Sequence, residues 1–278
     1  MEWIDLIKAL LLGIVEGVTE FAPVSSTGHM ILVDEMWLKT KLFLGDDAAN
    51  TFKIVIQLGS ILAVVIVFWK RLWSLLGLYK EVQTIDGSPN KTMSLKHVLI
   101  GLLPAAVLGL CFEDFIDEYL FSIETVLVGL VIGAILMLIA DRYASKTPSA
   151  KTLDEITYKQ ALLIGLFQCF SLWPGFSRSG STISGGVLLG LNHKTAADFT
   201  FIMAVPIMMG ASSLSLYKNW EHVKPEFISF YVVGFISAFV VAYLSIKFFL
   251  KLIEKIKLKP FAYYRIILAA VVAILYYG

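Results

Sequence analysis

Long apolar runs alternate with short polar segments along the whole chain. A helix needs about 17–25 apolar residues to cross about 30 Å of hydrocarbon. Six runs have roughly that length, and we expect each to form a membrane-spanning helix: 52–69, 97–113, 123–140, 199–217, 228–250 and 261–277. The pattern therefore predicts an all-α integral membrane protein with six transmembrane helices.

Two further apolar regions, 3–37 and 158–191, are interrupted by Pro, Gly, Ser and charged residues. Each uninterrupted half is too short to cross a bilayer comfortably. Irregular backbone at membrane depth is tolerated only where it is buried in protein or lines a wet cavity. We therefore expect two re-entrant helical hairpins, each made of a helix, a break and a second helix.

The two halves of the chain resemble each other at a constant offset of 152 residues. Each half, about 1–141 and about 155–278, holds one hairpin and three spanning helices. Because three crossings is an odd number, the second repeat is expected to sit upside down, which gives an inverted-topology repeat within a single membrane domain. The matched pairs include Gly13 and Gly165, Glu16 and Gln168, Ser25 and Ser177, Thr27 and Ser179, and Gly28 and Gly180.

The composition agrees with this class of protein. Of the 278 residues, 58% are hydrophobic and 16% are charged, and the mean hydropathy of +0.78 lies well above soluble usage. The net charge is +1 and no long charge run occurs, so we expect no nucleic-acid partner. Cys111 and Cys169 lie in separate apolar stretches, and we interpret both as packing residues.

The charges of the connecting segments predict the orientation in the membrane. The segments 70–96, 141–159 and 247–259 are rich in Lys and Arg, whereas the connections that begin at Glu113 and Tyr217 are acidic or mixed. Because cytoplasmic loops are enriched in Lys and Arg, we expect the three basic segments in the cytoplasm and both termini outside. The hairpins then enter from opposite faces, and their tips are expected to meet near the midplane.

The first hairpin carries two carboxylates in the stretch GIVEGVTEFAPVSSTGHM, residues 13–30. If residues 6–21 are helical, Glu16 and Glu20 lie four residues apart and share one face. Paired carboxylates hold a hard divalent cation through oxygen ligands, or they act as an acid and a base. The alternative is a solvated helix face that lies outside the membrane.

Hydroxyl groups and an imidazole follow the break in the first hairpin. The proline before them removes a backbone donor and ends the first helix. Ser25, Ser26 and Thr27 are residue types that cap helices, so we expect a second helix over about 29–37 whose free N–H groups attract an anion. His29 is a candidate catalytic imidazole, and a hydrogen-bonded core histidine is the alternative.

The second hairpin carries the stretch WPGFSRSGSTISGG, in which Arg178 is the cation. A guanidinium at bilayer depth costs about 3 kcal/mol on insertion scales, so we expect it to be paired or functional. Its planar fork suits phosphate oxygens. Ser177, Ser179 and Ser181 supply hydroxyls, and a helix is expected to begin near Ser181. The alternative is a structural ion pair with a carboxylate of the first hairpin.

With these residues in view, the chain resembles the undecaprenyl-diphosphate phosphatase family of the bacitracin-resistance type. The block EGVTEFAPVSSTGH at 16–29 and the block PGFSRSGST at 174–182 look like the two signature motifs of that family, and VIQLGSILAV from Val55 is also similar. The resemblance covers essentially the full length. It implies hydrolysis of undecaprenyl diphosphate, the lipid carrier of bacterial cell-wall synthesis, to the monophosphate and phosphate, with resistance to bacitracin.

The resemblance also implies roles for particular residues, a divalent cation (Mg²⁺ or Ca²⁺) and a place in the bacterial cytoplasmic membrane. Glu16 and Glu20 are the expected metal ligands, membrane lipid is the expected surroundings, and a homodimer is a candidate assembly. The local sequence favours a helix-cap or surface role for Asp154, whereas the resemblance makes it a further candidate functional position. The expected catalytic residues are Glu16, Glu20, Ser26, His29 and Arg178, and the expected substrate-binding residues are Ser25, Thr27, Ser177, Ser179 and Thr182.

Two questions stay open on the sequence. The attacking group is Ser26 with His29 as its base and Glu16 or Glu20 orienting the ring, or His29 itself, or a metal-activated water. The three-residue spacing of Ser26 and His29 favours the first. Inverted repeats with broken helices are also a common plan of transporters, so a lipid-carrier transporter or flippase is the alternative function.

Overall fold

The computed structural model describes residues 3–79, 92–120, 122–218 and 224–278. Within these ranges the regular elements are helices and no strand occurs, which confirms the all-α prediction. The elements are α1 (Trp3–Thr19), α2 (Ser26–Met30), a π-helix (Ile31–Leu38), α3 (Lys41–Leu44), α4 (Asp46–Val67), α5 (Trp69–Leu75), α6 (Leu95–Cys111), α7 (Glu113–Tyr119), α8 (Ile123–Tyr143), α9 (Tyr158–Cys169), α10 (Arg178–Leu188), α11 (His193–Lys218), α12 (Ile228–Ile256) and α13 (Lys259–Tyr277), with 3₁₀ turns at Leu153–Glu155, Phe170–Leu172 and Pro225–Phe227.

Each of the six apolar runs coincides with most of one helix. Five of these helices, α4, α8, α11, α12 and α13, are long and apolar enough to cross a membrane. The sixth, α6, is apolar but has only 17 residues. Residues 80–91, which belong to the basic segment 70–96, lie outside the described residues.

The two interrupted regions each form a helix, a break and a second helix. In the first region α1 is followed by α2, which continues as the π-helix. In the second region α9 is followed by a 3₁₀ turn and α10. The second helices begin at Ser26 and Arg178, three residues earlier than the pattern predicted, because the cap lies at the first hydroxyl of each run.

The two caps have the same geometry. Ser25 has φ 71° and ψ 99°, and its Oγ accepts a hydrogen bond from Gly28 N at 3.4 Å. Ser177 has φ 74° and ψ 118°, and its Oγ accepts from Gly180 N at 3.2 Å. A positive φ is uncommon for a residue with a Cβ. A serine with a positive φ therefore precedes the second helix of each hairpin, and the two serines are matched by the offset of 152.

Glycines let the first hairpin pack closely on a helix of the second half. α12 lies along α1 and α4. A Cβ at Gly13 would lie 1.9 Å from Ser237 Oγ, and one at Gly17 would lie 2.7 Å from Ala238 O. Small residues at such contacts are typical of membrane proteins, where apolar surface alone does not drive helices together.

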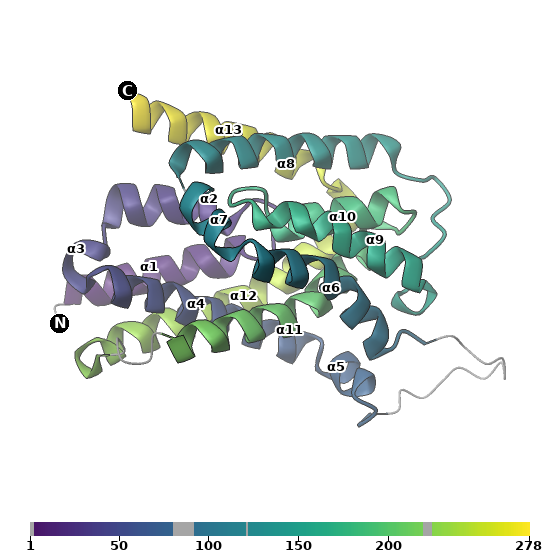
Figure 1. The fold of residues 1–278 in the computed structure, drawn as a ribbon, viewed down its shortest axis with the longest axis horizontal. Coiled ribbons are helices and arrows are strands. Elements are labelled where there is room, and N and C mark those ends of the chain that lie inside the picture. Colours follow the sequence, from purple (N-terminus) through teal and green to yellow (C-terminus); the bar gives the residue numbers. More distant parts are fainter. Residues whose placement is uncertain (1–2, 80–91, 121, 219–223) are drawn as a thin grey trace.

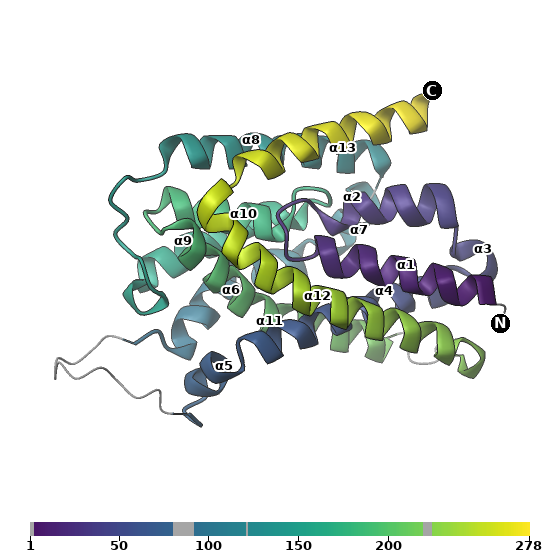
Figure 2. The ribbon, with the colours of Figure 1, turned by 180° about the vertical axis from the view of Figure 1, so that it is seen from behind.

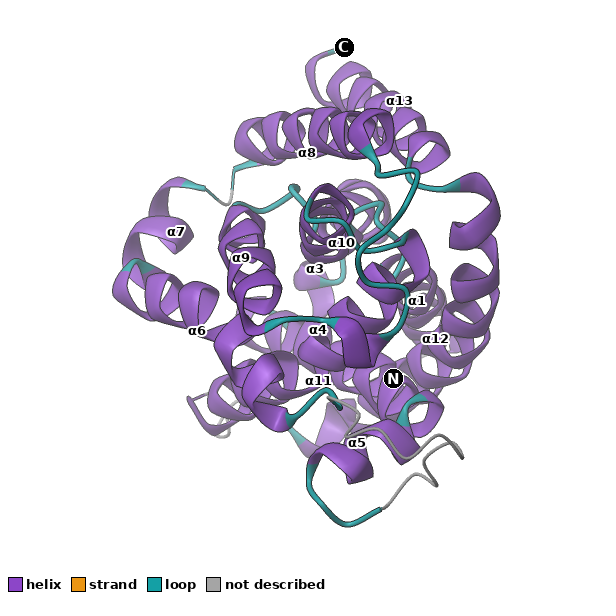
Figure 3. Cartoon of the chain, turned by 90° about the vertical axis from the view of Figure 1, so that its right-hand side faces the viewer, coloured by secondary structure: helices purple, strands orange, loops and turns teal. Residues whose placement is uncertain are grey.

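The hairpins enter the bundle from opposite ends. Figure 1 and Figure 2 show α1 starting at the end where the chain termini lie, and α9 starting at the other end. α10 lies inside the bundle when it is viewed end-on (Figure 3), and residues 179–187 are all buried. The polar stretches of both hairpins are thus brought into the interior of the bundle.

Candidate active site

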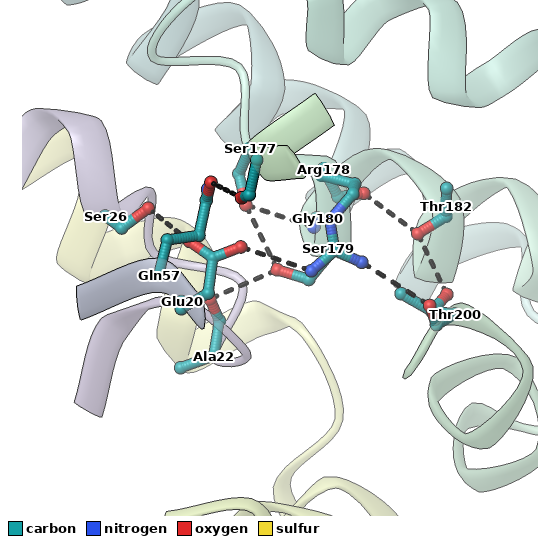
Figure 4. Close-up of polar contacts among 11 residues, drawn as sticks. Glu20, Ala22, Ser26, Gln57, Ser177, Arg178, Ser179, Gly180, Thr182 and Thr200 are labelled. Atoms are coloured by element: carbon teal, nitrogen blue, oxygen red, sulfur yellow. Dashed lines mark hydrogen bonds and ion pairs between the residues drawn. The ribbon is translucent and has the colours of Figure 1, made fainter. Parts of the chain in front are cut away.

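An ion pair joins the two hairpins where they meet. Arg178 Nη2 lies 3.3 Å from Glu20 Oε1, and the two side chains are only 14% and 9% exposed (Figure 4). Nearby, Ser179 Oγ donates a hydrogen bond to Ala22 O at 3.2 Å. Arg178 Nη1 also donates to Thr200 O at 3.4 Å. The segments predicted as hairpin tips are therefore in direct contact.

The same carboxylate also binds a hydroxyl of the first hairpin. Ser26 Oγ donates a hydrogen bond to Glu20 Oε2 at 2.7 Å, so one carboxylate oxygen faces the serine and the other faces Arg178 (Figure 4). Ser26 and Arg178 are partly buried, and each has one buried neighbour, Ser25 and Ser179 respectively. A nucleophile type, a base and a cation thus form one continuous chain of contacts.

Both ring nitrogens of His29 bind groups other than Ser26, so the hydrogen bond predicted from the spacing of Ser26 and His29 is wrong. Its Nδ1 lies 2.8 Å from Ser25 O, and its Nε2 lies 2.7 Å from Tyr264 Oη. The imidazole and phenol rings are stacked with centroids 5.6 Å apart. The imidazole of His29 thus binds the carbonyl of the residue four positions earlier. The carboxylate of Glu20, which was expected to orient the imidazole, binds Ser26 instead.

Glu16 lies on the last turn of α1 and is only 5% exposed. Its charged neighbours are Glu20 and Arg178. The part of the chain that the structure describes contains no group of three or more metal-ligating His, Cys, Asp or Glu side chains. A hard cation such as Mg²⁺ is commonly held by one or two carboxylates together with substrate phosphates. The donor set of Glu16 and Glu20 fits that kind of site.

The remaining hydroxyls of the site hold the second hairpin together. Ser177 Oγ caps α10 and lies 3.2 Å from Ser179 Oγ. Thr182 Oγ1 donates to Arg178 O at 2.8 Å and accepts a hydrogen bond from Thr200 Oγ1 at 2.8 Å (Figure 4). These bonds fix the backbone that carries Arg178.

Asp154 belongs to a different polar cluster. It forms an ion pair with Arg71, which lies on α5, and its Oδ1 accepts a hydrogen bond from Met93 N at 2.7 Å. Its side chain is 40% exposed. Asp154 thus ties the short helix after α4 to the segment that precedes α6.

Sequence reasoning did not single out the contribution of α13. Tyr264, which lies on this helix, contacts His29. Arg265 beside it is fully buried. A signal was present, because an ionisable residue inside a membrane span is costly and usually functional, which is the argument that identified Arg178.

Comparison with known proteins identifies the family. A model of the family described as "Bacitracin resistance protein BacA" matches residues 9–271. A protein of Exiguobacterium sibiricum named undecaprenyl-diphosphatase is 69% identical over 277 residues, which cover 100% of both chains. Proteins with the same name are 64% identical in Geobacillus sp. (strain WCH70), over 100% of both chains, and 61% identical in Bacillus subtilis (strain 168), over 98% of both. The chain therefore belongs to the BacA family of bacitracin resistance proteins.

Proposed function

We propose that this protein hydrolyses undecaprenyl diphosphate to the monophosphate and phosphate, which recycles the lipid carrier of cell-wall synthesis. The observation that carries the proposal is the chain of contacts from Ser26 through Glu20 to Arg178. Cleavage of a phosphoric anhydride needs an activated nucleophile and neutralisation of the developing charge. Relatives named undecaprenyl-diphosphatase match the chain over its full length, which supports the same assignment.

Ser26 is the proposed nucleophile. A serine hydroxyl attacks well only when a neighbouring group takes its proton, and Glu20 Oε2 lies 2.7 Å away. The Ser26 Oγ forms a bond to the terminal phosphorus, and its proton passes to Glu20. The bond between that phosphorus and the bridging oxygen breaks, and the lipid monophosphate leaves. Water then attacks the phosphoserine, which releases phosphate and restores the hydroxyl.

His29 is proposed to orient the Ser25–Ser26 turn, because both of its ring nitrogens have hydrogen-bond partners. Direct attack by His29 and attack by an activated water are the other arrangements. Acid quench during turnover, followed by mapping of the phosphorylated residue, separates them. An acid-stable adduct at Ser26 supports the proposal, and an acid-labile adduct at His29 contradicts it.

Arg178 is proposed to clamp the diphosphate at the start of α10. Its guanidinium offers several donors in a planar fork, which suits phosphate oxygens. The N-terminal end of α10 adds a partial positive charge at the same place. Direct contact between the diphosphate and the neighbouring hydroxyls stays a prediction for Ser25, Thr27, Ser177, Ser179 and Thr182.

A divalent cation, Mg²⁺ or Ca²⁺, is proposed to be held by Glu16 and Glu20. The cation, when bound, neutralises charge on the diphosphate and orients it. Glu16 is buried on the last turn of α1, one helical turn before Glu20, so both carboxylates come from one short stretch of chain. Chelator is expected to lower the rate of phosphate release.

The proposed membrane topology has six spans and two re-entrant hairpins, in inverted repeats of a single membrane domain. The five long apolar helices, the apolar α6 and the matched caps of the hairpins support it. In Figure 1, α5, the α8–α9 connection and the α12–α13 connection lie opposite the chain termini, as expected if the basic segments are cytoplasmic. Labelling of a cysteine introduced at Lys151 by an impermeant reagent in intact cells would contradict this orientation. A homodimer stays a prediction.

The chain is a multi-pass protein of the bacterial cytoplasmic membrane. Its relatives are named for hydrolysis, and the transporter alternative receives no support from them. The decisive experiment uses purified protein in detergent, where no second compartment exists. Phosphate release from prenyl diphosphates of several lengths, suppressed by chelator, is the expected result. Absence of release with Mg²⁺ and with Ca²⁺ contradicts the proposed function.

A further inference from the structure

Two adjacent residues of α13, Tyr264 and Arg265, each bind a different hairpin. Adjacent side chains on a helix point about 100° apart, so one turn of a helix can face two neighbours. Tyr264 reaches the first hairpin at His29, and Arg265 reaches the turn of the second hairpin at Gly175. The proposed catalytic steps use neither residue.

Tyr264 fixes the orientation of the imidazole. A backbone carbonyl only accepts hydrogen bonds, so the 2.8 Å contact between His29 Nδ1 and Ser25 O requires the hydrogen on Nδ1. In the neutral ring Nε2 is then the acceptor, and Tyr264 Oη, 2.7 Å away, is its donor. The stacked rings, 11° from parallel, hold this geometry. Tyr264 thus selects one tautomer of His29 and, through it, holds the carbonyl of the strained Ser25.

Arg265 is fully buried and binds only neutral acceptors. Its Nη2 donates to Gly175 O at 2.8 Å and to Gly129 O at 3.2 Å, and its Nη1 lies 3.4 Å from Met137 Sδ. Its Nε has no hydrogen-bond partner. Among the described residues, no carboxylate balances its charge. The guanidinium therefore joins α8 to the turn that precedes Ser177.

Glycines make room for this guanidinium. A Cβ at Gly133 on α8 would lie 2.4 Å from Arg265 Nη2, and one at Gly180 would lie 2.9 Å from Arg265 Nη1. Gly180 belongs to the first turn of α10, whose N–H groups carry the positive end of the helix dipole. The charge of Arg265 therefore lies directly behind the helix start that also presents Arg178.

An unbalanced buried cation beside a positive helix end is unfavourable in the protein alone. An anion bound at that helix start offsets the cost. We infer that Tyr264 and Arg265 are a positioning pair, which holds the turns carrying Ser26 and Arg178 in register and supports a diphosphate between them. The effect of the pair on turnover rests on the proposed phosphatase function, whereas its effect on the hairpins does not.

Tyr264→Phe keeps the stacked ring and removes only the hydroxyl. We expect kcat to fall by about tenfold to a hundredfold, as for a small displacement of reacting groups, with KM within about threefold. Tyr263→Phe is the matched control, because Tyr263 is the preceding residue and is 51% exposed. Its kcat is expected to stay within about twofold. Equal kcat values in the two variants contradict the role of Tyr264.

Arg265→Gln removes the charge, and Arg265→Lys keeps the charge but loses the fork that bridges two carbonyls. Binding of a non-hydrolysable prenyl methylenediphosphonate, measured by thermal shift, tests the contribution of the Arg265 charge without turnover. We expect Arg265→Gln to weaken binding by at least about tenfold and Arg265→Lys to restore part of that loss. If Arg265→Gln does not fold, Arg265→Lys decides alone. Wild-type binding together with wild-type kcat overturns the role of Arg265. The deciding variant is Arg265→Gln, or Arg265→Lys if the glutamine variant does not fold.

The tautomer of His29 gives a readout that is independent of the reaction. Imidazole ¹⁵N NMR of the purified protein, assigned with a His29→Gln variant, is expected to show the Nδ1–H form in the wild type. Tyr264→Phe is expected to shift this signal, and Tyr263→Phe is not. If Tyr264→Phe shifts the ¹⁵N signal of His29 but the wild type releases no phosphate, the positioning pair is supported and the phosphatase function is contradicted. If the wild type releases phosphate but Tyr264→Phe causes no shift, the phosphatase function is supported and the positioning pair is contradicted.

Discussion

Ser25 and Ser177 adopt nearly the same backbone conformation, and each caps the helix that follows it by accepting a hydrogen bond from the third residue along. The next residue differs: Ser26 follows in the first hairpin and Arg178 in the second. The first hairpin contributes the carboxylates of Glu16 and Glu20 to the site, whereas the second contributes the guanidinium of Arg178. The two hairpins therefore share a backbone frame and divide the chemistry, so that neither hairpin alone has a balanced charge.

The largest effect on kcat is expected from removing the hydroxyl of Ser26, which hydrogen-bonds Glu20 in the first hairpin. Ser26→Ala should lower kcat by more than about a thousandfold, because the proposed nucleophile is removed. Single-turnover phosphate release in detergent measures it. If the variant keeps more than about a tenth of wild-type turnover, Ser26 does not attack the substrate. The first hairpin would then not be the one that supplies the nucleophile.

The ion pair between the hairpins should come next. Glu20→Gln removes the proposed base and Arg178→Lys removes the planar fork of the guanidinium, and each is expected to lower kcat by about a hundredfold to a thousandfold.

The charge-swapped double variant, Glu20→Arg with Arg178→Glu, separates structure from chemistry. It keeps an ion pair but places each group on the wrong hairpin. We expect it to fold and to stay inactive in the phosphate-release assay. Recovery of activity above both single variants would make the pair structural.

A smaller effect is expected for the metal response. Glu16→Gln removes one proposed ligand, so kcat at saturating Mg²⁺ should fall about tenfold or more and the response to chelator should weaken. Titration of phosphate release against Mg²⁺ measures both. The matched position in the second hairpin, Gln168, is buried and its Nε2 has no partner. Gln168→Leu should leave the metal response unchanged; if it alters that response as Glu16→Gln does, the carboxylate is not a ligand.

The smallest effect tests the shared frame itself. Ser25→Gly and Ser177→Gly each lose a cap but remove the strain of a positive φ, so each should change the free energy of unfolding by only a few tenths of a kcal/mol. Ser25→Val and Ser177→Val should be clearly worse, because a β-branched residue strongly disfavours positive φ. Thermal unfolding in detergent gives the comparison. A large difference between the two glycine variants would show that the caps are not equivalent.

Much of the architecture could be predicted from the sequence, because the lengths of apolar runs and the positions of helix-breaking residues are local properties. The apolar runs located the long helices, and Pro23 with the first serine run located the break of the first hairpin. The offset of 152 predicted that Arg178 and Glu20 come from matching hairpins, and they are in contact.

The sequence could not provide the partners of individual side chains. Spacing placed Ser26 beside His29, but Ser26 binds Glu20, and His29 binds the carbonyl of Ser25 and the hydroxyl of Tyr264. The second partner of His29 lies on α13, and nothing in the local sequence around either residue indicates that contact. Such contacts depend on which helices pack together, so they require the structure.

The close packing of Gly13 and Gly17 on α12 has a consequence for how the protein is made. α1 is completed at Thr19, and the helix that covers it begins only at Ile228. During synthesis the nascent first hairpin, with Glu16 and Glu20, therefore waits at the membrane until nearly the whole chain has been inserted. A truncated chain that lacks α12 leaves this surface of the first hairpin uncovered.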